Sequence, residues 1–135
     1  MKAYKTLYLF IFLLLGVYAC PPPPDPPQGP TTRELIVLPR TISSITTNGT
    51  AVSTTNAQVE FTVGGQYTLR IPDFSGLANT GSWTLSSDEK TIILEDGSTE
   101  VMATIVSISE TSMVLEFSYE YFKGNTVTYR ITLNS

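Results

Sequence analysis

The C-terminal part of the chain alternates apolar and polar residues with a period of two, and this pattern constrains the fold more than any other feature. Apolar side chains recur at every second position across residues 113–121 and again across residues 127–133. Successive side chains of a β-strand point to opposite faces of the sheet, so each run predicts a strand with one buried face. Lys123-Gly124-Asn125 lies between the runs and predicts a tight turn. We therefore expect an antiparallel hairpin.

The register of this hairpin follows from the need to satisfy both faces of the two strands. If the turn pairs Tyr121 with Val127, then Phe117 meets Ile131 on the buried face. On the outer face, Arg130 then lies diagonal to the two glutamates of the opposite strand.

A second hairpin is predicted around Gly64-Gly65-Gln66, since apolar residues alternate on both sides of this motif. The side chains expected to face inward are Val59, Phe61, Val63, Tyr67, Leu69 and Ile71. The same register sets Glu60 opposite Arg70 on the solvent face.

Further turns and strands are predicted from the same kinds of sequence pattern. Asn48-Gly49 and Asp96-Gly97 tolerate the positive φ angles of two-residue hairpin turns. These turns predict two pairs, Ile45 with Val52 and Leu94 with Thr99. Residues 81–85 and 90–95 predict two more strands, and no amphipathic helix stands out. The long irregular segment 72–80 is expected to fold back on the core or to cover an opening.

Short strands joined mostly by tight turns predict an all-β fold, an antiparallel up-and-down meander that closes into a small barrel of about eight strands. A two-sheet β-sandwich is the alternative. Sandwiches need crossings between sheets, whereas this chain offers local hairpin turns and few long links. The chain also lacks the Cys, Trp, Cys pattern of antibody domains.

The N-terminus has the order of zones found in a signal peptide. Lys2 and Lys5 precede an apolar run over residues 7–15, and residues 16–19 lead to Cys20. The run is shorter than the roughly 20 apolar residues of a membrane-spanning helix. Val17-Tyr18-Ala19-Cys20 resembles the lipobox of bacterial lipoproteins, which implies removal of residues 1–19 and attachment of diacylglycerol and acyl chains such as palmitate to Cys20.

A proline-rich spacer follows the predicted lipidation site. Seven of the nine prolines lie between residues 21 and 30, a composition typical of extended polyproline II. At about 3.1 Å per residue, residues 20–33 form a stiff stalk that holds a domain of residues 34–135 away from the bilayer. A ligand for a groove that recognises proline-rich segments is the alternative interpretation.

Charge and residue types exclude several functions. Without Lys2 and Lys5 the mature chain has six basic and twelve acidic residues, so we expect no nucleic-acid partner, because nucleic-acid affinity depends on Lys and Arg contacts with phosphates. The chain has no histidine and a single cysteine, which excludes His/Cys zinc sites and histidine-activated nucleophiles. No catalytic residue, metal site or cofactor is predicted, and the chain is expected not to be an enzyme.

Three weaker signals have structural explanations. The carboxylate pairs Asp88-Glu89 and Glu95-Asp96 fall in predicted surface turns, where solvation favours structural charge over acid catalysis or a weak calcium site. Trp83 is predicted to be a core residue, with stacking against an apolar or sugar ligand as the alternative. Asn48-Gly49-Thr50 matches a glycosylation sequon but is interpreted as a turn.

The stretch from residue 61 to residue 133 resembles the small lipocalin-like domains of lipoproteins from Bacteroidetes-type bacteria. The matching pieces are residues 59–69 (VEFTVGGQYTL), 80–86 (TGSWTLS), 90–94 (KTIIL) and 105–115. The resemblance implies a lipocalin-like barrel and a binding role. Residues 38–42 lack the tryptophan that often marks the first strand of such domains.

Together these features predict a noncatalytic lipoprotein of the bacterial cell envelope. Lipid on Cys20 is expected to attach the protein to a membrane. The outer membrane is the expected location, and the sequence leaves open whether the domain lies on the periplasmic or the surface face. A small apolar ligand at the barrel mouth or at segment 72–80 is the first expected partner. The alternative is a solid barrel that serves as a structural or accessory module and contacts another envelope protein.

Overall fold

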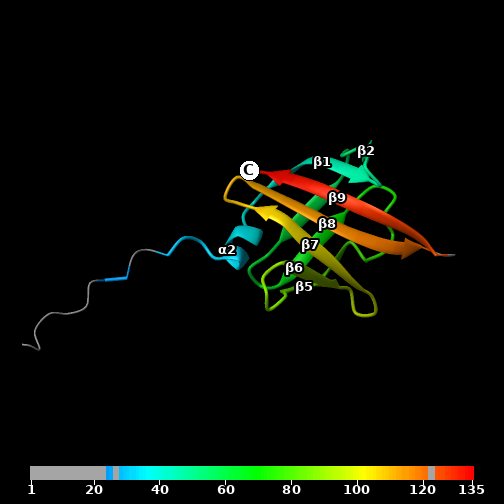
Figure 1. Ribbon diagram of the computed structural model, residues 1–135. Coiled ribbons are helices and arrows are strands. Elements are labelled where there is room, and N and C mark those ends of the chain that lie inside the picture. Colours follow the sequence, from blue (N-terminus) through cyan, green and yellow to red (C-terminus); the bar gives the residue numbers. More distant parts are fainter. Residues whose placement is uncertain (1–23, 26–27, 122–123) are drawn as a thin grey trace, which may run out of the picture.

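Nine antiparallel strands form a single sheet in this computed structural model, which describes residues 24–25, 28–121 and 124–135. A short helix, α2 (Thr32–Ile36), precedes them (Figure 1). The strands are β1 (Thr41–Thr47), β2 (Thr50–Val52), β3 (Gln58–Phe61), β4 (Gln66–Arg70), β5 (Thr80–Leu85), β6 (Thr91–Glu95), β7 (Glu100–Ile108), β8 (Ser112–Tyr121) and β9 (Asn125–Asn134).

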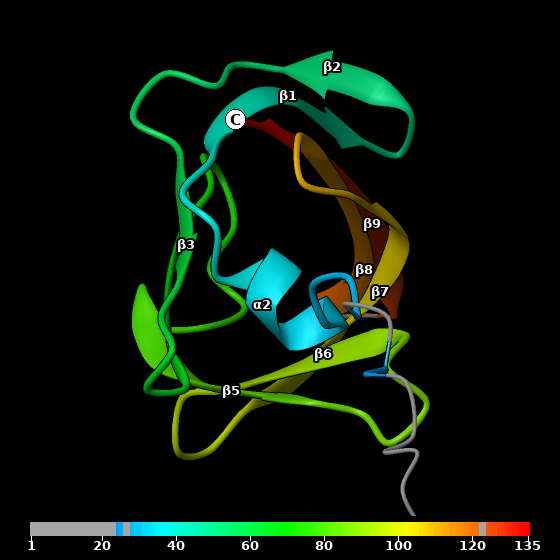
Figure 2. The ribbon, with the colours of Figure 1, turned by 90° about the vertical axis from the view of Figure 1, so that its left-hand side faces the viewer.

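The sheet is an up-and-down meander that curls into an open half-barrel. From β3 to β9 each strand lies beside the next in sequence, and the β1–β2 hairpin joins the sheet alongside β9. The edge strands β2 and β3 share no ladder, although β1 comes close to β3 (Figure 2). The predicted all-β meander is confirmed, with nine strands where about eight were expected, and the single sheet rules out the two-sheet sandwich.

The core lies inside the curl and includes most of the inward side chains that alternation predicted for the β3–β4 and β8–β9 hairpins. Each of these residues is at most 8% exposed, and burial of one large apolar side chain contributes about 1.5–3 kcal/mol. The core residues are Ile36, Ile45, Val59, Phe61, Tyr67, Leu69, Ile71, Leu77, Trp83, Ile92, Leu94, Val101, Ala103, Met113, Leu115, Phe117, Tyr129, Ile131 and Leu133. Val63 was expected to face inward, but it is 76% exposed in the β3–β4 turn.

The β1–β2 register is the one that the sequence predicted correctly. Ile45 pairs with Val52. Asn48 and Gly49 have φ angles of 48° and 80°, the two positive values that define a type I′ turn.

The predicted register of β3 and β4 is wrong by two residues. Glu60 faces Thr68 instead of Arg70, and Arg70 faces Gln58. The cause is the turn: the Thr62 amide donates to the Gln66 carbonyl at 2.9 Å, which leaves a three-residue loop ending in Gly65 at φ 78°. A shift of two preserves the faces of both strands, so the predicted faces of the paired residues are still correct.

The β8–β9 register is also shifted by two residues. Tyr121 pairs with Asn125 instead of Val127, so Phe117 faces Tyr129 and not Ile131. Arg130 consequently lies directly opposite Glu116 instead of diagonal to it.

The β6–β7 turn uses different residues from those predicted. Leu94 pairs with Val101 instead of Thr99, because Asp96 and Thr99 close the turn and Gly97-Ser98 forms its two-residue loop. Gly97 has φ 97°, which suits a turn that requires positive φ at its first central residue.

Two segments cover the ends of the barrel. Helix α2 lies across one mouth (Figure 2) and buries Ile36 to 1% exposure. The sequence reasoning missed this helix, which begins within the predicted spacer. At the other end, segment 72–80 folds onto the core as predicted: Leu77 is buried, and Phe74 packs edge-on against Phe117, with ring centroids 5.3 Å apart.

Candidate functional site

The predicted lipidation site, Cys20, lies outside the described residues, as do residues 1–19 and most of the proline run. Of the predicted spacer, residues 24–25 and 28–33 are described; residues 24–25 and 28–31 are exposed and have no helix or strand, and α2 begins at Thr32. In the part of the chain that the structure describes, no helix is long and apolar enough to cross a membrane.

Trp83 is a core residue, as predicted. It is 2% exposed, and its indole Nε1 donates to the Thr62 carbonyl at 3.1 Å. Phe61 meets the ring edge-on at 5.7 Å, and the Arg33 guanidinium lies 4.8 Å from the ring centroid. These contacts satisfy the polar atom and cover the aromatic surface, so Trp83 does not form an open wall for stacking.

The acidic turn residues hold loops in place. Asp88 accepts hydrogen bonds from the Ser86 hydroxyl at 2.6 Å and from the Lys90 amide at 3.2 Å, and these bonds lower the pKa of its carboxyl group. Asp96 accepts from the amides of Ala78 at 2.7 Å and Thr99 at 3.1 Å, which lower its pKa as well. A general acid needs a raised pKa, so neither carboxylate suits that role.

The other polar residues that stood out in the sequence also have structural roles. Glu89 accepts from the Thr32 hydroxyl at 2.7 Å and so fixes the start of α2. Asn48 of the sequon-like motif lies in the β1–β2 turn, where its side-chain oxygen accepts from the Thr128 amide at 2.9 Å. Among the described residues, no three His, Cys, Asp or Glu side chains are placed to hold a metal ion.

The mouth under α2 contains a small enclosed hollow. Its volume is about 70 Å³, and mainly apolar side chains line it, including Ile36, Phe61 and Met113. Arg40 borders the hollow and donates to the carbonyls of Leu35 and Ser109, which clamps the helix end to the β7–β8 turn. The Nε of Arg40 is buried without a hydrogen-bond partner.

The opposite mouth is closed by aromatic rings. Phe74 packs against Tyr119 at 5.6 Å and against Tyr129 at 5.1 Å. The hydroxyls of Tyr121 and Tyr129 share a hydrogen bond of 2.7 Å. Burial raises the pKa of the Tyr129 hydroxyl, and its bond to Tyr121 raises it further, so this phenol stays protonated.

A surface hollow lies where β7 and β8 separate. The two strands pair from Thr104–Glu116 to Ile108–Met113, but residues 100–103 and 117–121 do not pair with each other. In Figure 1 the strands diverge toward the end of the barrel away from α2. We call the resulting hollow of about 560 Å³ the β7–β8 cleft; it is lined by Glu100, Val101, Met102, Thr104, Glu116, Phe117, Ser118, Tyr119 and Glu120.

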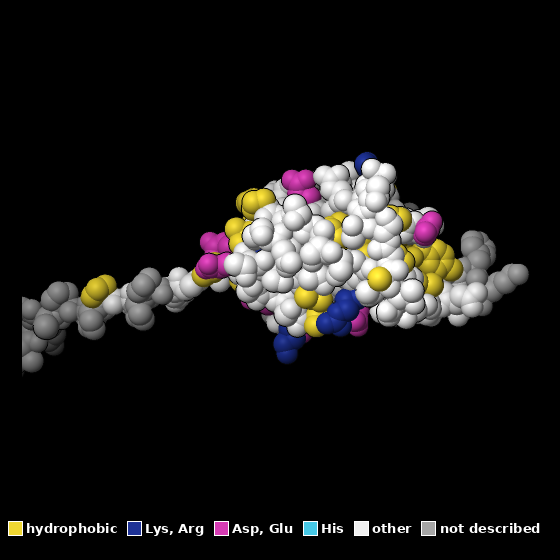
Figure 3. Space-filling view, turned by 90° about the horizontal axis from the view of Figure 1, so that it is seen from above, with side chains coloured by type: hydrophobic (Ala, Val, Ile, Leu, Met, Phe, Trp, Pro, Cys, Tyr) yellow, Lys and Arg dark blue, Asp and Glu magenta, His cyan; other side chains and the backbone are white. Residues whose placement is uncertain are grey.

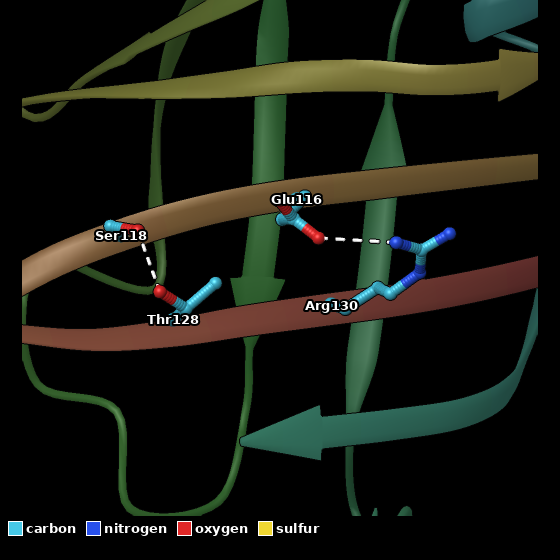
Figure 4. A network of polar contacts seen from close by, with 4 residues as sticks. All are labelled: Glu116, Ser118, Thr128 and Arg130. Carbon is cyan, nitrogen blue, oxygen red and sulfur yellow. Dashed lines mark hydrogen bonds and ion pairs between the residues drawn. The ribbon is translucent and has the colours of Figure 1, made fainter. Parts of the chain in front are cut away.

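The β7–β8 cleft has an apolar base and an acidic rim. Val101 and Phe117 close its base at 4% and 3% exposure, while Met102 on the outer face is 60% exposed. Glu116 forms an ion pair of 3.2 Å with Arg130 of β9, beside a 2.8 Å hydrogen bond between Ser118 and Thr128 (Figure 4). The sequence reasoning did not find this cleft, because the alternation in β7 and β8 continues through it.

The outer face over β1, β2 and β9 differs from the cleft. Its side chains are mostly uncharged, with few acidic or basic groups (Figure 3). Serine and threonine dominate the outward positions of these strands, and Ser43 and Thr41 donate to backbone carbonyls of β9.

No protein-family model matches the chain, and no curated protein matches it. The class of the protein therefore rests on the fold and surfaces of the described residues: an open antiparallel half-barrel with a packed interior, covered mouths and an external cleft between β7 and β8.

Proposed function

We propose that this chain is a noncatalytic lipoprotein of the bacterial cell envelope, anchored at the outer membrane through lipid on Cys20, whose β-domain contacts another envelope protein through its outer surface. The observation that carries the proposal is the packed interior. Tyr67, Trp83 and Ile131 are each at most 2% exposed inside the curl, and α2 and segment 72–80 cover the two mouths. The outer surface is the part of the domain left to meet a partner.

A lipid anchor favours contacts between this outer surface and neighbouring membrane proteins. A domain tethered to a membrane meets neighbouring membrane proteins at a high effective concentration, so a contact of modest affinity is enough for stable association. The acidic balance of the mature chain keeps the domain soluble between encounters.

A small apolar ligand at the barrel mouth is the second candidate. It is favoured by the apolar hollow beneath α2, where Arg40 could meet a polar head group. The hollow holds only about 70 Å³, whereas ligand pockets usually measure about 300–1,000 Å³. Such a ligand would have to displace α2, so the hollow supports this candidate less than the packed interior supports the first.

Photo-crosslinking in living cells tests the proposed function. A photoreactive residue is placed at one exposed outward position on each of four strands: Ser43, Glu60, Thr84 and Met102. We expect at least one position to capture the same envelope protein reproducibly, and Cys20→Ser to abolish the capture because the unlipidated protein is not anchored at the outer membrane. An unspecific set of proteins at all four positions, together with a small molecule that copurifies in native mass spectrometry, would overturn the proposal in favour of ligand binding.

A further inference from the structure

Strand β2 forms one edge of the sheet and pairs with β1 alone. Figure 2 shows it at the rim of the molecule, beyond β1. Thr50 and Ala51 are exposed, as is Ser53 directly after the strand, and Val52 is half-buried. The outer side of β2 is therefore an open strand edge, where another chain can add a strand.

The geometry of the β1–β2 hairpin fixes which backbone groups lie along this edge. A two-residue loop makes the flanking residues, Thr47 and Thr50, a hydrogen-bonded pair, and every second pair of an antiparallel ladder is of this kind. Thr50 and Val52 thus use their N–H and C=O groups toward β1. Ala51 lies between them, so its N–H and C=O groups point away from the sheet, and those of Ser53 follow the same alternation.

The surface beside this edge lacks the charges that keep copies of an acidic protein apart. No Asp, Glu, Lys or Arg occurs between Arg40 and Glu60, and the outer face over β1, β2 and β9 is mostly uncharged (Figure 3). Acidic residues outnumber basic ones in the whole chain, so two copies repel each other where acidic faces meet. Strand β2 also lacks the lysine, proline or bulge that protects many edge strands.

The other edge of the sheet, β3, is less suited to a second copy. Segment 37–40 lies beside Val59 and Phe61 of β3 at the hollow beneath α2, and β1 comes close to β3. Glu60 places an exposed charge on this strand. A contact of β2 with β3 would also be heterologous and could continue into an open chain of copies, whereas a contact of β2 with β2 closes as a two-fold dimer.

We propose that two copies of this chain associate edge to edge through β2, as an antiparallel pair related by a two-fold axis at Val52. In this register, Ala51 of each copy exchanges a pair of backbone hydrogen bonds with Ser53 of the other copy. An axis at Ala51 would use only one such pair of bonds, because the next residue along the edge, Gly49, lies in the turn with φ 80°. The inference goes beyond the proposed function, in which the partner is another envelope protein.

The short edge makes this association weak in dilute solution, and the proposed lipid anchor strengthens it, because copies that share one bilayer meet at a high effective concentration. The antiparallel pairing points the two α2 mouths in opposite directions, so the spacers must reach the bilayer from both ends of the dimer. Residues 20–31 of the predicted spacer extend to roughly 37 Å. The ten-residue strands β8 and β9 measure roughly 33 Å, so the spacer is long enough for both copies to stay anchored.

Disulfide trapping in isolated membranes tests the proposal. Val52→Cys is introduced into the full chain, and membranes of the producing cells are treated with copper phenanthroline. The proposed axis places residue 52 opposite its own copy as a non-hydrogen-bonded pair, whose Cα atoms lie about 4.5 Å apart, within the range that a disulfide requires. We expect at least about tenfold more disulfide-linked dimer than from Thr84→Cys, a control at an exposed outward position on β5.

Two variants at position 51 show whether backbone pairing is responsible. Ala51→Pro removes an N–H group that β1 does not use, and edge strands tolerate proline, so this variant should leave the unfolding temperature unchanged. Combined with Val52→Cys, it should abolish the trapped dimer. Ala51→Val, which keeps the N–H group, should leave trapping unchanged.

Wild-type protein supplies the background, because its Cys20 thiol is free only where lipidation fails. A wild-type disulfide dimer would therefore count against the lipid anchor and not against the β2 contact, which is measured as the excess in Val52→Cys. Trapping no greater than that of Thr84→Cys, or trapping that survives Ala51→Pro, would overturn the proposed self-association, whatever envelope proteins the photo-crosslinks capture.

Discussion

Gly81 shows how a single residue sets the packing of three strands. It lies in β5 opposite Tyr67 of β4. A Cβ atom at this position would lie 2.2 Å from the Glu95 carbonyl oxygen and 2.7 Å from the Tyr67 ring. The tyrosine ring therefore covers the glycine and fills the space that a side chain would otherwise occupy, as aromatic residues do for glycines in other sheets.

Replacement of Gly81 by alanine is expected to destabilise the domain by about 1–3 kcal/mol, the usual cost of overpacking, because backbone as well as ring must move. Gly64→Ala is the matched control: its nearest neighbour would be the Thr62 hydroxyl at 3.8 Å, so its effect should stay within about 0.5 kcal/mol. Urea unfolding followed by tryptophan fluorescence measures both. Equal stability of the two variants would show that Gly81 is not closely packed.

Helix α2 is stabilised by its cap and by one buried side chain. The Thr31 hydroxyl accepts from the Glu34 amide at 3.3 Å, and the Glu34 carboxylate accepts from the Thr31 amide at 2.7 Å. This capping box lowers the pKa of Glu34 through the hydrogen bonds from Thr31. Five residues are too few for an isolated helix to be stable in water, so α2 depends on the contact of Ile36 with the core.

Ile36→Ala is accordingly expected to lower the free energy of unfolding by about 2–5 kcal/mol, since it leaves a cavity at the covered mouth. Leu38→Ala, at a position 37% exposed, should cost much less. Thermal unfolding by circular dichroism compares the two variants. A similar loss in both would mean that α2 does not seal the barrel.

At the element scale, sequence alternation predicted which face of β3, β4, β8 and β9 is buried but not the partner of each residue. A shift of two residues keeps every side chain on its face, so the apolar pattern cannot detect it. Turn geometry decides the register instead, and overlapping turn motifs can predict the wrong turn. Asp96-Gly97 is a good turn motif, yet Gly97-Ser98 forms the loop. Asn48-Gly49 had no such competitor and gave the correct register.

The missed elements have physical reasons as well. A helix of five residues shows no 3.6-residue periodicity, although Thr31 and Glu34 form a capping-box motif that a search for helix starts would find. The β7–β8 cleft arises because residues 100–103 follow β6 while residues 117–121 follow β9. That separation is a property of the curled sheet, and neither strand alone encodes it.

At the scale of the whole molecule, the proposed function depends on both the half-barrel and the N-terminal segment. The packed half-barrel offers its outer surface, and the N-terminal segment is expected to hold that surface at a membrane. Burial of acyl chains contributes about 0.8 kcal/mol per CH₂, and two or more chains make attachment stable. Without lipid, the acidic domain is expected to leave the membrane.

Intact-mass analysis of the wild-type protein recovered from membranes tests this lipid anchor most directly. We predict a mass that lacks residues 1–19 and gains diacylglycerol and acyl chains on Cys20. Cys20→Ser, which has no thiol to acylate, should be either retained as the unprocessed precursor or released without lipid. An unmodified thiol at Cys20 in an otherwise mature chain would contradict the proposal that the protein is a lipoprotein.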